Sequence, residues 1–151
     1  SYDGTQWIAA DPQPDAAAYK AANADKLARY GETVTRLAKA IRDFGAEPIF
    51  VTQHRGSYRR VDGKVYVGPG PDGRVGLSHF IGIAAVNETT MKVCRQVKAI
   101  CIDLAAKINF VDGDHYDGLH TTPVGSAKIA KLLFNELQGV LKFSGAGKPP
   151  R

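Results

Sequence analysis

The sequence has no apolar run that approaches the roughly 20 residues needed to cross a bilayer. It also lacks a dense block of one charge: the net charge is +5, but Lys and Arg are spread along the chain. The densest basic group, Arg55, Arg59 and Arg60, is small. A solvated basic surface accounts for such a pattern. We therefore expect neither a membrane span nor a nucleic-acid partner.

Cysteine is scarce as well, because Cys94 and Cys101 are the only two. They lie seven positions apart in a stretch whose apolar spacing predicts a helix, which would separate them by about 10 Å along the helix axis. That separation exceeds the reach of a disulfide. We therefore expect two thiols in the core.

The remaining composition is typical of one globular domain, with 44% hydrophobic and 23% charged residues in a chain of 151. After a loop-like stretch over residues 1–22, apolar residues recur every three or four positions from Asn23 to Phe44, which predicts an amphipathic helix. Gly45 fits the C-cap of this helix. The apolar run over residues 49–52 then predicts a strand that is buried on both faces.

Residues 53–82 form a long irregular section. Within it, residues 58–61 and 64–67 flank Asp62-Gly63, which is the strongest short-range signal for a β-hairpin. A connection of this length often covers a functional site, and a surface flap without a role is the alternative.

The rest of the pattern predicts a helix over residues 83–107, a strand over residues 108–111, and a final helix that begins at Pro123 with Thr122 as its N-cap. The order is thus helix, strand, helix, strand, helix. Two buried strands do not make a stable parallel sheet with both faces covered. We expect the chain either to pair with another polypeptide or to be the carboxyl-terminal part of a larger α/β domain.

A cluster of polar side chains follows the last predicted strand. It lies in a loop between the carboxyl end of that strand and the start of the final helix, which is the edge where open α/β sheets bind ligands. The cluster consists of Asp112, Asp114, His115, Asp117 and His120. Its spacing matches neither the calcium-binding loop nor the two-histidine zinc motif, so we expect no metal ion here.

Asp117 and His120 suggest a different chemistry within this loop. A histidine that acts as a general base needs a carboxylate to hold its tautomer and to stabilise its protonated form. Because the two residues are three positions apart in a tight loop, the carboxylate of Asp117 could bind one ring nitrogen of His120, and the second ring nitrogen could face a nucleophile. The alternative is a loop whose Asp and Thr side chains only cap the following helix.

The longer string Asp117 to Gly125, DGLHTTPVG, resembles the final sequence block of the SGNH (GDSL-type) hydrolases, which follows a strand and opens the last helix. The passage FGAEPIFVTQ at residues 44–53 is similar to the helix-to-strand passage of the same family. The resemblance runs from about Ala22 to Leu141 and is most specific from Tyr116 to Gly125.

This resemblance implies that His120 is the general base that activates a serine, and that Asp117 orients and stabilises the imidazole. It also implies a three-layer α/β/α sandwich around a parallel sheet, the flavodoxin-like fold of that family. The implied reaction is hydrolysis of a small-molecule or carbohydrate ester through an acyl-enzyme, with no cofactor.

The Gly-Asp-Ser, Gly and Gly-x-Asn-Asp blocks of the family, which carry its nucleophile and oxyanion-hole donors, do not occur in this sequence. We therefore expect residues 1–143 to be the carboxyl-terminal part of a single SGNH hydrolase domain, followed by a flexible tail over residues 144–151. The amino-terminal part of the hydrolase would be a partner of this chain. A non-catalytic carbohydrate- or partner-binding remnant of the same fold is the alternative.

Two further histidines are candidates for substrate binding. His54 directly follows a predicted strand, at the edge where ligands gather, although a loop hydrogen bond explains it equally well. His115 would line the same pocket, and a solvated loop position is the alternative.

Overall fold

The computed structural model describes residues 4–10, 16–68 and 74–140. Helices outweigh strands in the described part of the chain. The helices are α1 (Ala16–Ala22), α2 (Ala24–Asp43), α3 (Arg74–Gln96), α4 (Leu104–Lys107) and α5 (Pro123–Gln138). The strands are β1 (Ile8–Ala9), β2 (Ile49–Val51), β3 (Tyr58–Val61), β4 (Lys64–Val67) and β5 (Ile100–Ile102).

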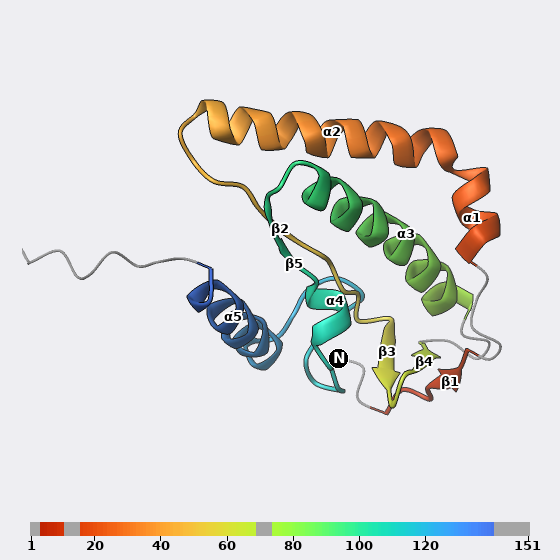
Figure 1. The fold of residues 1–151 in the computed structure, drawn as a ribbon. Helices are drawn as coiled ribbons and strands as arrows, with labels where there is room; N and C mark the ends of the chain where they lie inside the picture. The colour runs from red at the N-terminus through yellow and green to blue at the C-terminus, as the bar shows by residue number, and fades with distance from the viewer. Residues whose placement is uncertain (1–3, 11–15, 69–73, 141–151) are drawn as a thin grey trace, which may run out of the picture.

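The strands β2 and β5 form a parallel pair, in which Ile49 lies opposite Ile100 and Val51 opposite Ile102. Figure 1 shows α2 and α3 on one side of this pair, and α4 and α5 on the other. The chain is therefore α/β, as expected. The full three-layer sandwich around a parallel sheet is not formed, because the described residues supply only two strands to this sheet.

A second, antiparallel sheet has the strand order β1-β4-β3. The predicted hairpin is confirmed, with Tyr58 opposite Val67 and Val61 opposite Lys64. Asp62 and Gly63 both have positive φ, at 49° and 77°, which is the backbone conformation that a two-residue hairpin turn requires.

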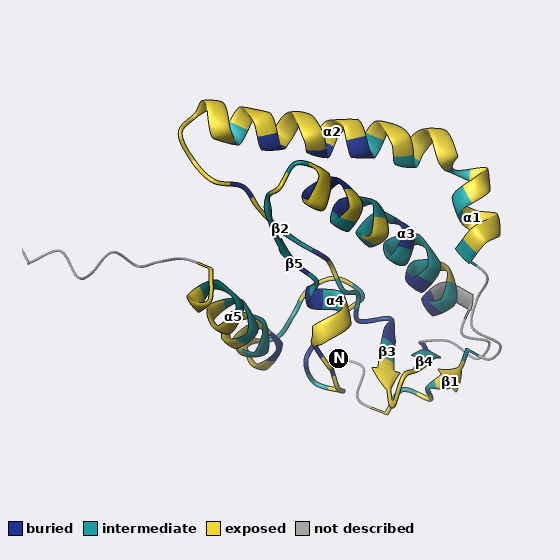
Figure 2. Ribbon diagram, in the orientation of Figure 1, coloured by how far each residue is buried: buried dark blue, intermediate teal, exposed yellow. Residues whose placement is uncertain are grey.

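The helix predicted from Asn23 is also confirmed, as α2. Its side chains are exposed along the outer side and buried towards α3 (Figure 2), where Val34 and Ala38 lie in the core. The chain leaves the helix through Gly45, whose φ of +86° is the left-handed conformation typical of a helix end. The strand that follows is more open than expected, because Ile49 is exposed.

The helix predicted over residues 83–107 is wrong in its extent. The helix α3 ends at Gln96, the chain turns at Lys98 with a φ of 54°, and residues 100–102 form β5. Apolar residues at 97, 100, 101 and 104 continue the helical spacing across this turn. Pairing with β2 overrides that local pattern, because a buried strand needs only a short apolar run.

Two other local predictions are wrong. Residues 108–111 form no strand in the described structure, and Ile108 and Phe110 instead fill a core cluster with Leu104. The stretch over residues 1–22 is not only loop, because it contains β1 and α1.

The expectation of two free thiols is wrong as well. Cys94 on α3 and Cys101 on β5 form a disulfide, with 6.0 Å between their Cα atoms. The predicted separation assumed one continuous helix. Because the chain reverses between the two residues, they come within ordinary disulfide reach.

Across the described ranges, no helix combines the length and the apolar character that a membrane span requires. The predicted tail over residues 144–151 lies outside the described residues.

Candidate functional site

The loop that carries Asp117 and His120 is closed at its base by hydrogen bonds between its two ends. The backbone N–H of Thr122 donates to the carbonyl of Asp114 over 2.9 Å, and the Thr122 hydroxyl donates to the carbonyl of Gly113 over 2.7 Å. The same hydroxyl oxygen accepts the N–H of Gly125 over 3.2 Å, which caps α5 as predicted. The loop therefore has a fixed base on the final helix.

Asp117 and His120 lie in direct contact at the tip of this loop. Oδ2 of Asp117 lies 2.8 Å from Nδ1 of His120. Oδ1 of Asp117 accepts the backbone N–H groups of Leu119 and His120, over 2.7 and 2.8 Å. A carboxylate that accepts these N–H groups forms a local turn, so the contact is built from neighbours in the sequence.

These hydrogen bonds hold the pKa of Asp117 well below its usual range. The main cause is the backbone N–H of His120, followed by the hydrogen bond from its ring and the N–H of Leu119. An ionised carboxylate can only accept hydrogen bonds. Nδ1 of His120 therefore carries a proton and donates it, which in the neutral ring leaves Nε2 as an acceptor.

The imidazole of His120 is open to its surroundings, with 70% of its side chain exposed, against 56% for Asp117. Nε2 forms no hydrogen bond to the described residues. There is room beside it for a hydroxyl group. An oriented imidazole with a free acceptor is the arrangement that a general base requires.

An ion pair between Asp114 in the loop and Lys128 on α5 holds the loop against this helix. Asp114 is 1% exposed, and its Oδ2 lies 2.6 Å from Nζ of Lys128 on α5. The same oxygen accepts the backbone N–H of Val111 over 2.7 Å. The sequence places Asp114 in the polar cluster, but a partner fourteen positions away on a helix gives no local signal.

Gly125 allows α5 to approach the loop this closely. A Cβ atom at this position would overlap the carbonyl oxygen of Asp114, which is backbone and cannot swing aside. The glycine is needed here for space rather than for an unusual φ.

His54 and His115 come together in one cavity of about 290 Å³ beside the loop. Their ring centroids lie 5.8 Å apart, and each lies 4.6 Å from the ring of Phe110. The full lining also includes the two neighbours of His120 in the chain: Thr52, Gln53, His54, Leu104, Phe110, His115, Leu119, Thr121 and Ile129. A mostly apolar cavity with a few polar groups is typical of a small-molecule site.

Both of these rings are neutral near pH 7. Burial lowers the pKa of His54 to about 3, helped by the charges of His115 and Arg60. Burial also lowers the pKa of His115, although Asp114 and Asp117 act in the opposite direction. His115 is 3% exposed, so the alternative of a solvated loop position is wrong. The buried Nδ1 of His54 forms no hydrogen bond in the described part of the chain.

Asp112, the remaining carboxylate of the polar cluster, is held by hydrogen bonds from Trp7 and Arg59. Oδ1 of Asp112 accepts from Nε1 of Trp7 over 3.0 Å and from Arg59 over 3.1 Å. The guanidinium of Arg59 lies 4.4 Å from the centroid of the Trp7 ring. Within residues 4–10, 16–68 and 74–140, no three His, Cys, Asp or Glu side chains converge on a point that could hold a metal ion.

None of the serines in the described ranges is hydrogen-bonded to His120. Ser57 is buried and bonds Nδ1 of His79 over 2.8 Å, and the hydroxyl of Ser126 bonds that of Thr121 over 2.8 Å. Ser78 lies on α3. The described part of the chain thus holds an oriented imidazole and places no serine hydroxyl in a hydrogen bond with it.

Comparison with known proteins gives no match to a family model, to a curated protein or to a solved structure.

Proposed function

We propose that this chain supplies the aspartate and histidine of a serine ester hydrolase of the SGNH type. The observation that carries the proposal is the 2.8 Å contact between Asp117 and Nδ1 of His120. The side chain of His120 is exposed, and its Nε2 has no hydrogen-bond partner among the described residues. In this proposal the nucleophilic serine and the oxyanion-hole donors come from the amino-terminal part of the hydrolase.

The reaction uses His120 twice. Nε2 takes the proton of the serine hydroxyl while the serine oxygen attacks the ester carbonyl carbon. The tetrahedral intermediate then breaks its bond to the alcohol, which leaves with the proton from Nε2, and an acyl-enzyme remains. Water then attacks the acyl carbonyl carbon while Nε2 takes one of its protons. The second tetrahedral intermediate breaks its bond to the serine oxygen, which regains the proton from Nε2, and the acid is released. Asp117 stabilises the imidazolium at each stage but does not take up the proton.

The cavity of His54 and His115 is the proposed site for the substrate. It is bounded by Leu119 and Thr121, which flank His120 in the chain. Its neutral imidazoles and apolar walls suit an uncharged group of a small-molecule or carbohydrate ester.

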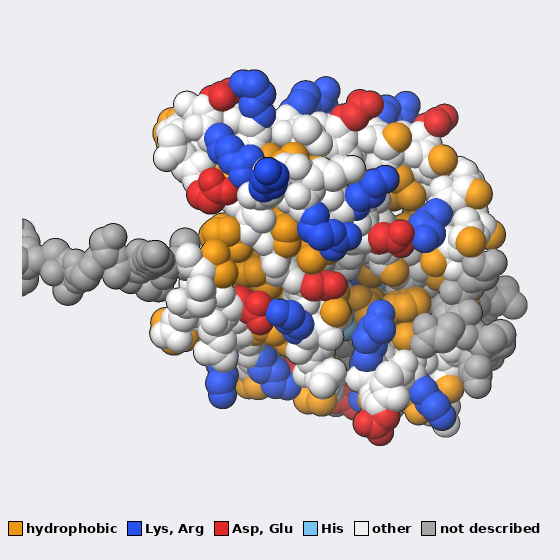
Figure 3. Space-filling model, in the orientation of Figure 1, with side chains coloured by type: hydrophobic (Ala, Val, Ile, Leu, Met, Phe, Trp, Pro, Cys, Tyr) orange, Lys and Arg blue, Asp and Glu red, His pale blue; other side chains and the backbone are white. Residues whose placement is uncertain are grey.

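The unfinished parallel sheet supports a partner for this chain. Pro48 accepts a backbone bond from Ile100, and Thr52 donates one to Ile102. Because hydrogen-bonding directions alternate along a strand, the backbone groups of Ile49 and Val51 point away from β5. The described residues place no strand there. Figure 3 shows hydrophobic side chains gathered on this face between α2 and α5, the region of the parallel pair. In this proposal, strands of the amino-terminal part complete a three-layer sandwich at this edge.

A fluorophosphonate probe tests this proposal, because it labels only an activated serine. The chain is purified with any polypeptide that accompanies it, treated with the probe, and examined by intact mass and peptide mapping. We expect the label on a serine of the accompanying polypeptide, and loss of the label in His120→Ala. Absence of label from every polypeptide in an assembled, folded preparation would contradict the proposal.

The second candidate is a non-catalytic carbohydrate- or partner-binding remnant of the same fold. The cavity favours it, because its lining comes from this chain alone. A binding remnant would bind a carbohydrate or a partner, and the fluorophosphonate probe would label no serine.

A further inference from the structure

A second cavity, separate from that of His54 and His115, lies between α3, β3 and α4. Its volume is about 310 Å³, at the lower end of the range for small-molecule sites. One face of α3 supplies residues at helical spacing, and β3 supplies two residues that alternate along the strand. The lining comprises Tyr58, Arg60, Phe80, Ala84, Asn87, Glu88, Met91, Arg95, Asp103, Ala105 and Ala106.

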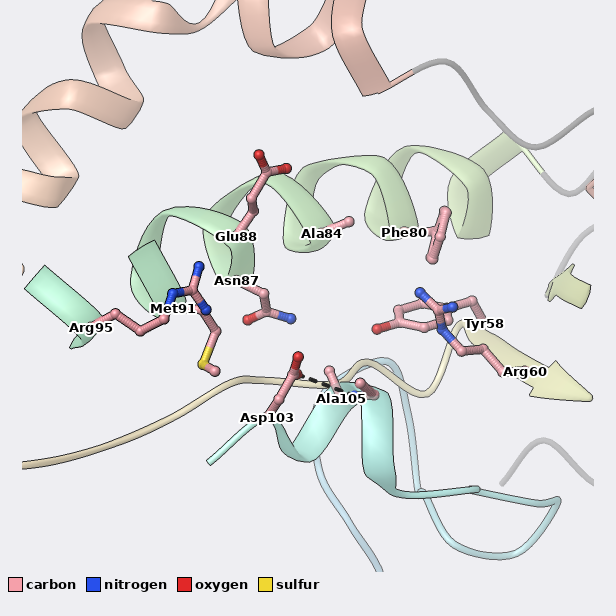
Figure 4. A pocket seen from close by; sticks show the side chains of 11 residues that line it. Tyr58, Arg60, Phe80, Ala84, Asn87, Glu88, Met91, Arg95, Asp103 and Ala105 are labelled. Carbon is pink, nitrogen blue, oxygen red and sulfur yellow. Dashed lines mark hydrogen bonds between the residues drawn. The ribbon is translucent and has the colours of Figure 1, made fainter. Parts of the chain in front are cut away.

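Two arginines stand at opposite ends of this cavity (Figure 4), Arg95 at one end and Arg60 beside Tyr58 at the other. Neither guanidinium forms an ion pair or a hydrogen bond with the described residues. Arg60 lies over the ring of Phe80, at 5.5 Å from its centroid. Guanidinium groups bind carboxylates through paired hydrogen bonds, so two free ones are candidates for two anionic groups.

The two acidic side chains at the cavity already have donors. Glu88 forms an ion pair with Lys20 over 3.0 Å. Oδ1 of Asp103 accepts the hydroxyl of Thr52 over 2.8 Å and the N–H of Ala106 over 3.3 Å. Glu88 thus has a cationic partner and Asp103 has neutral hydrogen-bond donors. Among the described residues, the guanidinium groups of Arg60 and Arg95 have no acceptor.

The surface between the two arginines is mainly apolar. Ala84 and Met91 on α3 lie across the cavity from Ala105 on α4 (Figure 4), and Ala106 also lines the cavity. Asn87 is held in place by its two hydrogen bonds to the backbone of Gln53, over 2.9 and 2.7 Å. A ligand that fits this surface has an apolar body between its charged ends.

We propose that this cavity binds an elongated dicarboxylate, with one carboxylate on Arg60, the other on Arg95, and a methylene chain along the alanine and methionine side chains. The site is independent of the proposed hydrolase function, because Asp117 and His120 do not line it.

Isothermal titration calorimetry with linear dicarboxylates from succinate to sebacate tests this proposal at low salt, where ion pairs are least screened. We expect one chain length to bind best, and the monocarboxylate of equal length to bind at least tenfold more weakly. Arg60→Gln and Arg95→Gln should each weaken the best dicarboxylate at least tenfold. Arg29→Gln, an exposed position on α2 outside the cavity, is the matched control and should leave binding unchanged.

A further variant tests the cavity by filling it. Ala106→Phe adds a ring from the exposed side and should abolish binding, while circular dichroism checks that the fold is kept. The proposal is overturned if no dicarboxylate binds the unaltered protein, or if folded Arg60→Gln and Arg95→Gln both bind as well as the control.

Discussion

Nδ1 of His120 lies 2.8 Å from Oδ2 of Asp117, and the other oxygen of the same carboxylate accepts the backbone N–H of His120 itself. One side chain therefore fixes both the backbone and the ring of the histidine. Because the two residues are three positions apart, the arrangement does not need distant parts of the chain. This local origin leads to a first prediction about pH.

The contribution of Asp117 to stability should depend on pH. Its hydrogen bonds hold its pKa below the ordinary value of 3.8. Its stabilising effect is therefore complete above about pH 4 and is lost as the pH falls towards the lower pKa of the folded state. Urea unfolding at pH 6 and pH 3 should show a smaller difference between the unaltered protein and Asp117→Asn at pH 3. An equal difference at both pH values would contradict this account of the turn.

Gly125→Ala should destabilise the loop, because the added Cβ overlaps the carbonyl oxygen of Asp114. We expect a loss of about 1–3 kcal/mol in urea unfolding, the usual cost of forced backbone shifts. Gly139→Ala is the control, because its nearest neighbour would lie 3.8 Å away and its φ is −74°. The control should be neutral or slightly stabilising. Similar losses in both variants would show that the close approach does not matter.

Lys128→Met should be much more destabilising than a change at another lysine of α5. It leaves the carboxylate of Asp114 buried without its charged partner. Breaking a buried pair typically costs about 3–5 kcal/mol, and we expect about 2–3 because the Lys128 side chain is 36% exposed. Lys131→Met, at an exposed position one turn along, is the control. The prediction is wrong if Lys128→Met and Lys131→Met lower the free energy of unfolding by the same amount.

Reduction of the disulfide between Cys94 and Cys101 should lower stability. The bridge closes a short loop, with a sequence separation of 7. A loop of this length contributes roughly 2–3 kcal/mol through the unfolded state. Thermal unfolding with and without reductant measures the effect, and Cys94→Ser with Cys101→Ser should match the reduced protein. A midpoint unchanged by reductant, with the formation of two free thiols verified by mass, would count against the bridge.

The sequence predicts most reliably those parts of the fold that have a local chemical signal. Asp62 and Gly63 define their hairpin and Gly45 ends α2 through their backbone conformations, and Thr122 caps α5 through its hydroxyl. The strand β5 gives no such signal, because its apolar residues also fit the spacing of the preceding helix. Only its pairing with β2, about fifty residues earlier, identifies it as a strand.

The candidate site also has one contact that the local sequence predicts and others that depend on tertiary packing. The contact between Asp117 and His120 follows from a spacing of three within a tight loop. The joint cavity of His54 and His115 depends on how β2 and the loop pack, which the sequence does not encode locally. The buried pair between Asp114 and Lys128 depends on the docking of α5 in the same manner.

The most direct test of the central claim is turnover of p-nitrophenyl acetate by the assembled protein, measured for the unaltered chain and for His120→Ala. We expect the variant to fold, keep its partner and lose at least a thousandfold in kcat, since His120 is the proposed acceptor of the serine proton. Unchanged turnover in His120→Ala would contradict the assignment of His120 as the general base.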